Sequence, residues 1–323
     1  MKQTIPIFFS VNDAYAPFLA VALNSVKSNA SEKYNYKVHI LNDDISEENR
    51  IRLQTLESDN FALEFISLTE KLHTLFPDGR LEQHSFGAFS SLTIYFRLFI
   101  PALFPQYDKG IYLDSDIVVP GDISQLWEER LGRNLVGACA DYSIQHIAPF
   151  TRYIDRYVGV DHRRYVNSGV LLLNMKRLRE VDMAGRFLHW MSTYSLDTVA
   201  PDQDYLNALC WNAIHYLDPA WNTMPLEKKA SDRAPMVVHF NLATKPWLNR
   251  SVPFDDIFWQ YARSSGYNSE IRATRKAFLK DDSALQNYNS SVESLIKMAS
   301  SLAESGISFR SLISERKEFR LCC

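Results

Sequence analysis

The sequence predicts an α/β protein whose mixed, Rossmann-like sheet is flanked by helices and followed by a helical tail. Residues 1–67 alternate extended and helical patterns in the order β-α-β-α-β, which is typical of parallel strands joined by crossover helices. Two later apolar runs, residues 111–119 and 170–174, have the length and composition of buried strands. After residue 262, serines and charged residues dominate. We therefore expect one domain over residues 1–262 and a helical, basic and aromatic tail over residues 263–323.

The composition is that of an ordinary globular protein, with 46% apolar and 23% charged residues. A net charge of −3 argues against nucleic acid as a partner. We expect a cytoplasmic protein, because the chain has no apolar run of about 18 residues and no signal-peptide pattern. Cys139 and Cys210 are expected in the core. The terminal pair Cys322-Cys323 lacks the four-residue prenylation pattern, so lipidation is the minor alternative there.

The first three strands are expected at residues 5–10, 37–42 and 61–67. Ser46 is expected to cap the helix between the second and third strands. Ligands of parallel sheets bind at the carboxyl ends of strands, and Asn12 and Asp13 follow the first strand directly. The loop after that strand contains no glycine, which argues against a dinucleotide or P-loop site. A bound phosphate must then be neutralised by a metal and by side chains.

Two carboxylates interrupt the apolar run at residues 111–119, near its carboxyl end. Asp114 and Asp116 are separated by Ser115, so both carboxylates can reach one ion. Burying two like charges is costly unless a cation is present, and a divalent metal removes this cost. The alternative is that one aspartate caps the following turn and the other is solvated.

The middle of the chain adds further polar residues to predicted elements. Residues 91–100 are expected to form a helix that contains Arg97 and ends at Pro101. A strand over residues 136–140 is followed by Asp141, and Asn167 precedes the strand at residues 170–174. We expect residues 142–165 to be irregular, either as a lid or acceptor-binding insertion or as a plain surface excursion.

The last third contains a further helix start, a strand and a basic corner. Asp202-Gln203-Asp204 opens a helix after Pro201, where capping alone could explain both acids. His239 ends a strand at residues 237–240, and Lys245-Pro246-Trp247 forms a rigid basic corner. An amphipathic helix is expected over residues 292–303. The stretch 309–323 suits peripheral attachment to an anionic membrane surface, with a solvated helical appendage or a dimer helix as alternatives.

In a doubly wound sheet, the polar residues at strand ends are expected to converge on one edge. They are Asn12, Asp13, Asp114, Asp116, Asp141, Asn167, Asp202, Gln203 and His239. Two carboxylates and an imidazole fit Mn²⁺ better than Mg²⁺, which is kept as the alternative. Arg97 and Lys245 are then available for a diphosphate. Together these features predict a nucleotide-sugar site.

Four motifs in this order resemble the family-eight retaining glycosyltransferases, which include bacterial lipopolysaccharide galactosyl- and glucosyltransferases and glycogenin. The resemblance covers roughly residues 4–250. The motifs are Tyr112-Leu113-Asp114-Ser115-Asp116, Asn167-Ser168-Gly169-Val170-Leu171-Leu172-Leu173-Asn174, Asp202-Gln203-Asp204, and His239-Phe240 with Lys245-Pro246-Trp247.

The resemblance implies a GT-A fold and a UDP-hexose donor, with galactose favoured over glucose. It also implies a saccharide acceptor, such as a lipopolysaccharide core or another glycolipid. Asp114, Asp116 and His239 match the Mn²⁺ ligands of the family. The matching donor-binding residues are Asn12, Asp13, Tyr15, Arg97, Asp114, Ser115, Asp141, Asn167, Asp202, Gln203 and Lys245. Gln203 and Asp202 match the residues beside the reacting sugar carbon.

Two positions depart from the family pattern. Leu242 stands where glycine is usual between the histidine and the lysine, and Ala14 stands where a polar residue is frequent. The amide of Gln203 is a poor nucleophile, which favours a front-face reaction over a covalent carboxylate adduct. In the front-face reaction, the acceptor hydroxyl attacks beside the departing diphosphate.

Two other interpretations remain open on the sequence alone. Asp114-Ser115-Asp116-Ile117-Val118 also fits the nucleophile signature of haloacid-dehalogenase-type phosphatases, although that signature normally opens its domain. A glycogenin-like or protein glucosyltransferase would need a modified tyrosine, and the chain has sixteen tyrosines.

Overall fold

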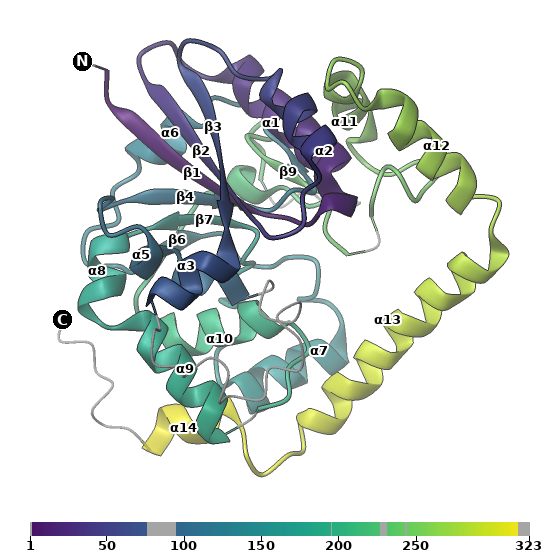
Figure 1. Cartoon of the computed structure of the whole chain (residues 1–323). Helices are drawn as coiled ribbons and strands as arrows, with labels where there is room; N and C mark the ends of the chain where they lie inside the picture. The colour runs from purple at the N-terminus through teal and green to yellow at the C-terminus, as the bar shows by residue number, and fades with distance from the viewer. Residues whose placement is uncertain (1, 76–94, 195, 227–230, 243, 316–323) are drawn as a thin grey trace. The chain divides into compact units, whose positions relative to one another are not determined.

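A computed structural model describes residues 2–75, 95–194, 196–226, 231–242 and 244–315 (Figure 1). The chain forms two compact units, each assembled from three separate stretches. Unit 1 comprises Met1–Asp78, Gly110–Arg130 and Asp218–Leu285, and unit 2 comprises Gly79–Lys109, Leu131–Leu217 and Gln286–Cys323. The division predicted at residues 262 and 263 stays a prediction.

Unit 1 contains the predicted β-α-β-α-β arrangement. Its four strands lie in the order β3-β2-β1-β4 and are all parallel, with Phe8 of β1 paired to His39 on one side and Tyr112 on the other. The elements of this part are β1 (Thr4–Ser10), α1 (Ala16–Asn29), β2 (Asn35–Asn42), α2 (Glu47–Gln54), β3 (Phe61–Ser67), α3 (Leu68–Leu75) and β4 (Gly110–Leu113). The strand and helix positions expected up to Ser67 are confirmed.

Local chemistry explains where the first helices begin and pack. The Ser46 hydroxyl accepts a hydrogen bond from the Asn49 amide at 3.3 Å, so Ser46 caps α2 as predicted. Helix α1 is buried along most of its length and packs against α11 (Asp255–Ala262). The Asn24 side chain donates a 2.8 Å hydrogen bond to the Tyr261 carbonyl and thereby ties α1 to α11.

The prediction of one strand over residues 111–119 is wrong. Strand β4 ends at Leu113, and β5 (Ile117–Val118) pairs antiparallel with β9 (Val238–His239) in a separate two-stranded sheet. The chain turns between β4 and β5, and the carboxylates of Asp114 and Asp116 have side-chain partners in this turn. This turn has a functional consequence, since the register of β5 and β9 pairs Ile117 with His239.

The remaining elements of unit 1 are short or lie late in the chain. They are the 3₁₀ turns η1 (Asp13–Tyr15) and η4 (Pro219–Asn222) and the helices α6 (Ser124–Glu128) and α12 (Asn268–Phe278). Helix α12 lies within the tail predicted to be helical over residues 263–323, but its bounds were not predicted, because Ile271 is its single buried residue and the rest of its surface is polar or charged.

Unit 2 contains three strands in the order β7-β6-β8, with β6 antiparallel to β7 and parallel to β8. Its elements are α5 (Phe96–Leu103), β6 (Val136–Ala138), α7 (Ala148–Tyr153), the π-helical η3 (Ile154–Val158), β7 (Val170–Leu173), α8 (Met175–Glu180), α9 (Met183–Tyr194), α10 (Pro201–Cys210), β8 (Ile214–Tyr216) and α14 (Phe309–Glu315). Cys139 and Cys210 are buried, as expected.

Two predictions about unit 2 are corrected. Helix α5 continues past Pro101 to Leu103, because a proline removes only one helical hydrogen bond and both Pro101 and Leu103 are buried. Residues 91–94 of the predicted helix lie outside the described residues. The segment expected to be irregular contains α7 and η3, which end at Gly159 in a left-handed conformation with φ of 83°.

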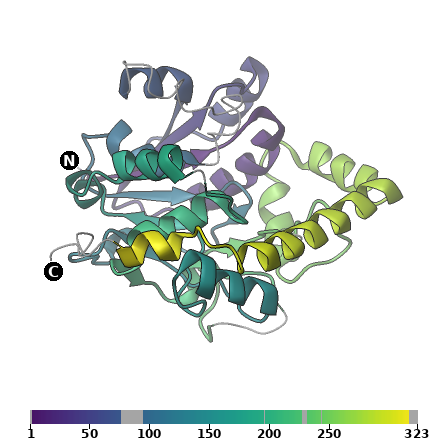
Figure 2. The same ribbon diagram turned by 90° about the horizontal axis from the view of Figure 1, so that it is seen from below.

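The C-terminal part of the chain is helical, as predicted. Helix α13 (Asp282–Leu302) covers most of the expected amphipathic stretch and leads to α14, which Figure 2 shows in yellow. Phe309 and Leu312 of α14 are buried, and the Phe309 ring lies 4.8 Å from the Tyr205 ring. None of the helices that the structure describes is both long and apolar enough to cross a membrane. Residues 316–323, with Cys322-Cys323, lie outside the described part.

Candidate active site

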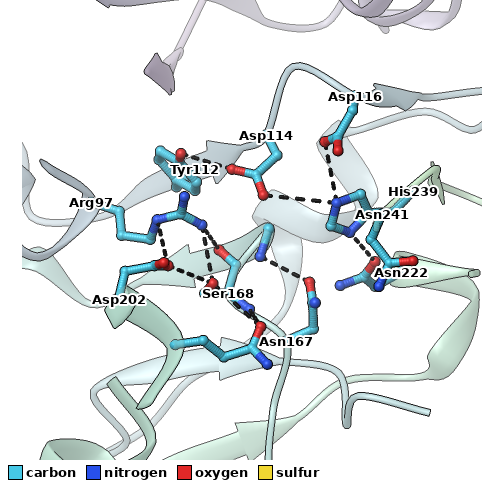
Figure 3. A network of polar contacts seen from close by, with 12 residues as sticks. Arg97, Tyr112, Asp114, Asp116, Asn167, Ser168, Asp202, Asn222, His239 and Asn241 are labelled. Carbon is cyan, nitrogen blue, oxygen red and sulfur yellow. Dashed lines mark hydrogen bonds and ion pairs between the residues drawn. The ribbon is translucent and has the colours of Figure 1, made fainter. Parts of the chain in front are cut away.

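Two carboxylates and one imidazole meet in unit 1 (Figure 3). The Nε2 atom of His239 lies 3.2 Å from Asp116 Oδ1 and 3.8 Å from Asp114 Oδ2. One potential ligand atom from each of the three residues lies within 4.8 Å of the others. His239 is buried, whereas both carboxylates are partly exposed. The arrangement brings the three residues predicted to bind the metal into one group.

Neighbouring side chains orient this group. His239 Nδ1 lies 3.0 Å from Asn222 Oδ1, which can only accept, so the hydrogen bond requires the proton on Nδ1. The same orientation turns Nε2, the other ring nitrogen, toward the two carboxylates, where it can serve as a metal ligand. The Tyr112 hydroxyl donates a 2.8 Å hydrogen bond to Asp114 Oδ1. Sequence reasoning missed Asn222, because nothing in its local sequence marks it as a partner of His239.

Lys245 lies beside the same group, and its ammonium contacts Asp116 Oδ2. Burial raises the pKa of Asp116, but the charge of Lys245 and the imidazole of His239 outweigh burial, so the pKa lies well below its usual value. Asp116 therefore stays ionised in the folded protein. Lys245 was predicted from the resemblance to contact a diphosphate, and the structure places this lysine on a predicted metal ligand.

The donor atoms fit a divalent cation. Two carboxylate oxygens and one imidazole nitrogen are ligands that Mn²⁺ accepts readily, whereas Mg²⁺ prefers oxygen and water. The partial exposure of Asp114 and Asp116 leaves a route for the ion to enter. Asn222 and Tyr112 supply the outer contacts that fix ligand orientation in metal sites.

The residues after β1 shape their own loop. Asn12 Oδ1 accepts a 3.2 Å hydrogen bond from the Tyr15 amide. Asp13 Oδ1 accepts from the Asn49 side chain at 2.7 Å and from the Ser46 amide at 2.8 Å, and these bonds lower the pKa of Asp13. The two predicted uridine contacts are therefore held rigidly by neighbours in unit 1.

An aromatic series connects this loop to the basic corner. The Tyr15 ring lies 5.4 Å from the Phe18 ring, which stacks on the Trp247 ring at 3.9 Å. Lys245 Nζ lies 5.7 Å from the centroid of the same indole. Unit 1 thus links the predicted uridine loop, the predicted diphosphate contact and the acidic group.

Unit 2 contains a second polar network, centred on Arg97 and Asp202 (Figure 3). Arg97 Nε lies 3.0 Å from Asp202 Oδ2, and Arg97 Nη1 donates to the Ser168 carbonyl at 2.7 Å. The Ser168 hydroxyl donates a 2.6 Å hydrogen bond to Asp202 Oδ2. Asp202 lies in the first turn of α10 and also pairs with the Arg97 guanidinium. Capping of the helix alone does not explain this ion pair.

Both ends of the Gln203 amide are engaged in this network. Gln203 Oε1 accepts from the Ser168 amide at 3.1 Å, and Gln203 Nε2 donates to Asp141 Oδ2 at 3.0 Å. Asn167 Nδ2 donates to the same Asp141 oxygen at 3.1 Å. These bonds fix the orientation of the Gln203 amide. Ser168 was part of a quoted motif but was not predicted as a site residue.

The third residue of the Asp-Gln-Asp motif has a different role. Asp204 is fully buried and accepts hydrogen bonds from the hydroxyls of Tyr165, at 2.6 Å, and Tyr153, at 2.7 Å. Burial raises the pKa of Asp204 to about 6 against the opposing effect of these hydrogen bonds. Asp204 therefore anchors the first turn of α10 to Tyr153 and Tyr165, which lie far apart in the segment between β6 and β7.

The predicted site residues fall into two groups, one in each unit. Asn12, Asp13, Tyr15, Asp114, Ser115, Asp116, His239 and Lys245 belong to unit 1, whereas Arg97, Asp141, Asn167, Asp202 and Gln203 belong to unit 2. Within each unit, side-chain contacts join most members of the group. The expectation that all of them share one edge of a sheet stays a prediction.

Comparison with curated proteins finds glycosyltransferases. A Haemophilus influenzae protein is 27% identical over 228 residues, which are 70% of this chain and 66% of that protein. The lipopolysaccharide 1,2-glucosyltransferase of Escherichia coli is 29% identical over 171 residues, which are 49% of each chain. The matched region thus spans just under two thirds of the first relative and about half of the second.

Solved structures confirm the expected GT-A fold. The apo structure of WbbM, a bifunctional glycosyltransferase, superposes with a TM-score of 0.70 at 24% identity, over 85% of this chain and 52% of that chain. The galactosyltransferase LgtC, solved with donor and acceptor sugar analogs, superposes with a TM-score of 0.63 at 25% identity, over 80% of this chain and 96% of LgtC.

The sequence model of one family covers most of the chain. Residues 6–251 match the model of glycosyl transferase family 8, and this range contains every residue of the two polar groups. The expected family is thereby confirmed, and with it the expectation of a glycosyltransferase. The chain belongs to glycosyl transferase family 8.

Proposed function

We propose that the protein is a retaining hexosyltransferase that moves a hexose from a UDP-sugar to a saccharide acceptor. Galactose is favoured over glucose, and the acceptor is a lipopolysaccharide-type core or another glycolipid. The Escherichia coli relative is a lipopolysaccharide glucosyltransferase, and LgtC is a galactosyltransferase, so both hexoses occur among similar proteins. The single observation that carries the proposal is the group of Asp114, Asp116 and His239 in a member of this family.

In this proposal, Asp114, Asp116 and His239 hold the cation, which is Mn²⁺ with Mg²⁺ as the alternative. When bound, such an ion stabilises the negative charge that develops on a leaving diphosphate. Asn222 holds the His239 ring with Nε2 directed toward the two carboxylates, and Tyr112 orients Asp114. The partly exposed Asp114 and the neighbouring, buried Ser115 are then also proposed to contact the donor.

Lys245 has a second proposed role. Its ammonium contacts Asp116, and it has few rotamers available because it is largely buried next to Trp247. We propose that Lys245 exchanges this carboxylate for a diphosphate oxygen when cation and donor bind together. Asn12, Asp13 and Tyr15 hold the uridine end, since their loop is joined to the same basic corner by Phe18 and Trp247.

The residues of unit 2 are proposed to orient the donor sugar. Arg97, Asp141, Asn167 and Asp202 are nearly buried polar groups that hold one another in fixed orientations. Gln203 is an amide with both ends engaged, so it is unsuited to form a covalent adduct. A front-face reaction follows, in which a diphosphate oxygen takes the acceptor's proton. Accumulation of a covalent glycosyl-enzyme in the wild type would contradict this route.

The test is release of UDP from UDP-galactose and from UDP-glucose, each with Mn²⁺ or with EDTA, and without acceptor. We expect slow hydrolysis of one donor, dependent on Mn²⁺ and lost in Asp116→Asn. Asp59→Asn, an exposed carboxylate in the same unit, is the matched control and should retain activity. Label transferred to the protein itself would indicate a glycogenin-like activity instead. No release from either donor, together with hydrolysis of a generic phosphomonoester, would replace the proposal with a phosphatase.

A further inference from the structure

Helix α12 in unit 1, labelled in Figure 1, borders a hollow with an unusual charge. The hollow has a volume of about 350 Å³. Five of its six lining residues are basic, and the sixth is leucine: Arg250, Arg272, Arg275, Lys276, Leu279 and Lys280. No carboxylate lines it. Neither polar network of the candidate active site contains any of these residues.

Among the described residues, the two central guanidinium groups are held in place by groups other than carboxylates. Arg275 Nε donates to the Asn249 carbonyl at 2.8 Å, and its Nη2 contacts the Arg250 carbonyl. The guanidinium carbons of Arg272 and Arg275 lie 4.6 Å and 5.3 Å from the centroid of the Trp259 ring. Carbonyls and an aromatic ring orient these cations and leave their charge uncompensated.

Like charges follow one another along the exposed side of α12 and just beyond its end. Arg272 and Lys276 are spaced four residues apart in α12, where like charges destabilise a helix, and Lys280 follows two residues after the helix ends at Phe278. Among the residues that the structure describes, no carboxylate lies within ion-pair distance of Lys276 or Lys280. Arg52, another cation of unit 1, in contrast pairs with Glu270 at 2.7 Å. A concentration of unpaired cations around a hollow indicates an anionic ligand.

Phosphate is the anion that this chemistry matches best. A guanidinium presents two parallel donors to phosphate oxygens, and an ammonium adds charge without a fixed direction. Several cations around one hollow suit a ligand with more than one negative charge. Leu279, which is 36% exposed, gives the rim an apolar contact. We propose that the α12 hollow binds a phosphate group, carried either by a membrane lipid headgroup or by a soluble diphosphate.

The test neutralises the two lysines, whose exposed side chains can be changed without loss of a described hydrogen bond. Lys276→Gln/Lys280→Gln is compared in the full-length protein with Lys2→Gln/Lys33→Gln, which removes two exposed lysines elsewhere in unit 1. Vesicles of phosphatidylglycerol in phosphatidylcholine probe the lipid source, with pure phosphatidylcholine as reference. Calorimetry with inorganic pyrophosphate in EDTA probes the soluble source without a metal.

We expect the wild type and the control to bind one of the two probes, and the α12 variant to bind it about thirtyfold more weakly. Lys280→Gln alone should lose part of the affinity, and added salt should weaken binding further. Loss of vesicle binding assigns the hollow to a lipid headgroup, and loss of pyrophosphate binding assigns it to a soluble ligand. Binding of neither probe by the wild type, or equal binding by both double variants, would overturn the proposal.

Discussion

Leu242 has a backbone conformation that is unfavourable for any residue with a β-carbon. Its φ is 47°, in the left-handed region, and its side chain is exposed, so no packing compensates for the strain. Leucine stands at a position where the family usually has glycine. The positive φ explains why glycine is usual there, because glycine adopts this conformation at little cost. The strain lies between His239 and Lys245, two residues of the candidate site.

Leu242→Gly should therefore raise the free energy of unfolding by up to about 1 kcal/mol, because glycine adopts this conformation at little cost. Urea denaturation of the two proteins measures the difference. Leu242→Ala is the control, since it removes the exposed side chain but keeps the β-carbon, and it should leave stability unchanged. A glycine variant less stable than the alanine variant would show that the conformation is not strained.

Asp204 is a fully buried carboxyl group whose ionisation is linked to folding. Its pKa is raised from 3.8 to about 6, chiefly by burial, so the folded protein holds this proton more tightly than the unfolded chain. The contribution of Asp204 to stability is therefore largest at low pH and is lost as the pH rises toward 6. Linkage limits the loss to roughly 3 kcal/mol.

Asp204→Asn should remove this part of the pH dependence. We expect the unfolding free energy of the wild type, relative to the variant, to fall as the pH rises from about 4 to about 6. Denaturant titrations at several pH values measure this difference, and Asp59→Asn controls for loss of an exposed carboxylate. Parallel pH profiles for wild type and Asp204→Asn would contradict the assignment.

At the level of secondary structure, prediction succeeded where local chemistry decides. The caps and apolar patterns within residues 1–67 correctly placed three strands and the helices between them. Prediction failed where pairing with a distant segment determines the bounds of a strand. The run at 111–119 forms two strands because β5 pairs with β9, and no local pattern reveals a partner so far away along the chain.

Helix α14 illustrates the same limit. The membrane attachment expected of residues 309–323 stays a prediction, but the composition of that stretch gave no sign that Phe309 is fully buried and contacts Trp190 and Tyr205 in unit 2. Phe309→Ala should therefore lower the unfolding free energy by about 3–5 kcal/mol. Ile307→Ala, at a 65% exposed position nearby, should change it by less than about 0.5 kcal/mol. Thermal or urea unfolding compares the two, and equal stabilities would mean that α14 is not anchored.

Across the whole molecule, the family could be predicted because four motifs occur in the right order along most of the chain. The residue types of the metal group could be predicted as well, since two acids and a histidine at strand ends indicate a cation. The residues that contact the metal group could not be predicted. Asn222 on His239 and Lys245 on Asp116 depend on how separate segments pack, and short polar contacts leave no periodic trace in the sequence.

The central claim is that Asp114, Asp116 and His239 hold the divalent cation. Titration of Mn²⁺ followed by electron paramagnetic resonance, with UDP present, tests this claim most directly in wild type and His239→Ala. His162→Ala is the matched control, because His162 belongs to a second group of two aspartates and a histidine, in unit 2. We predict that His239→Ala loses tight Mn²⁺ binding while His162→Ala retains it. Tight binding by His239→Ala equal to that of the wild type would contradict the account.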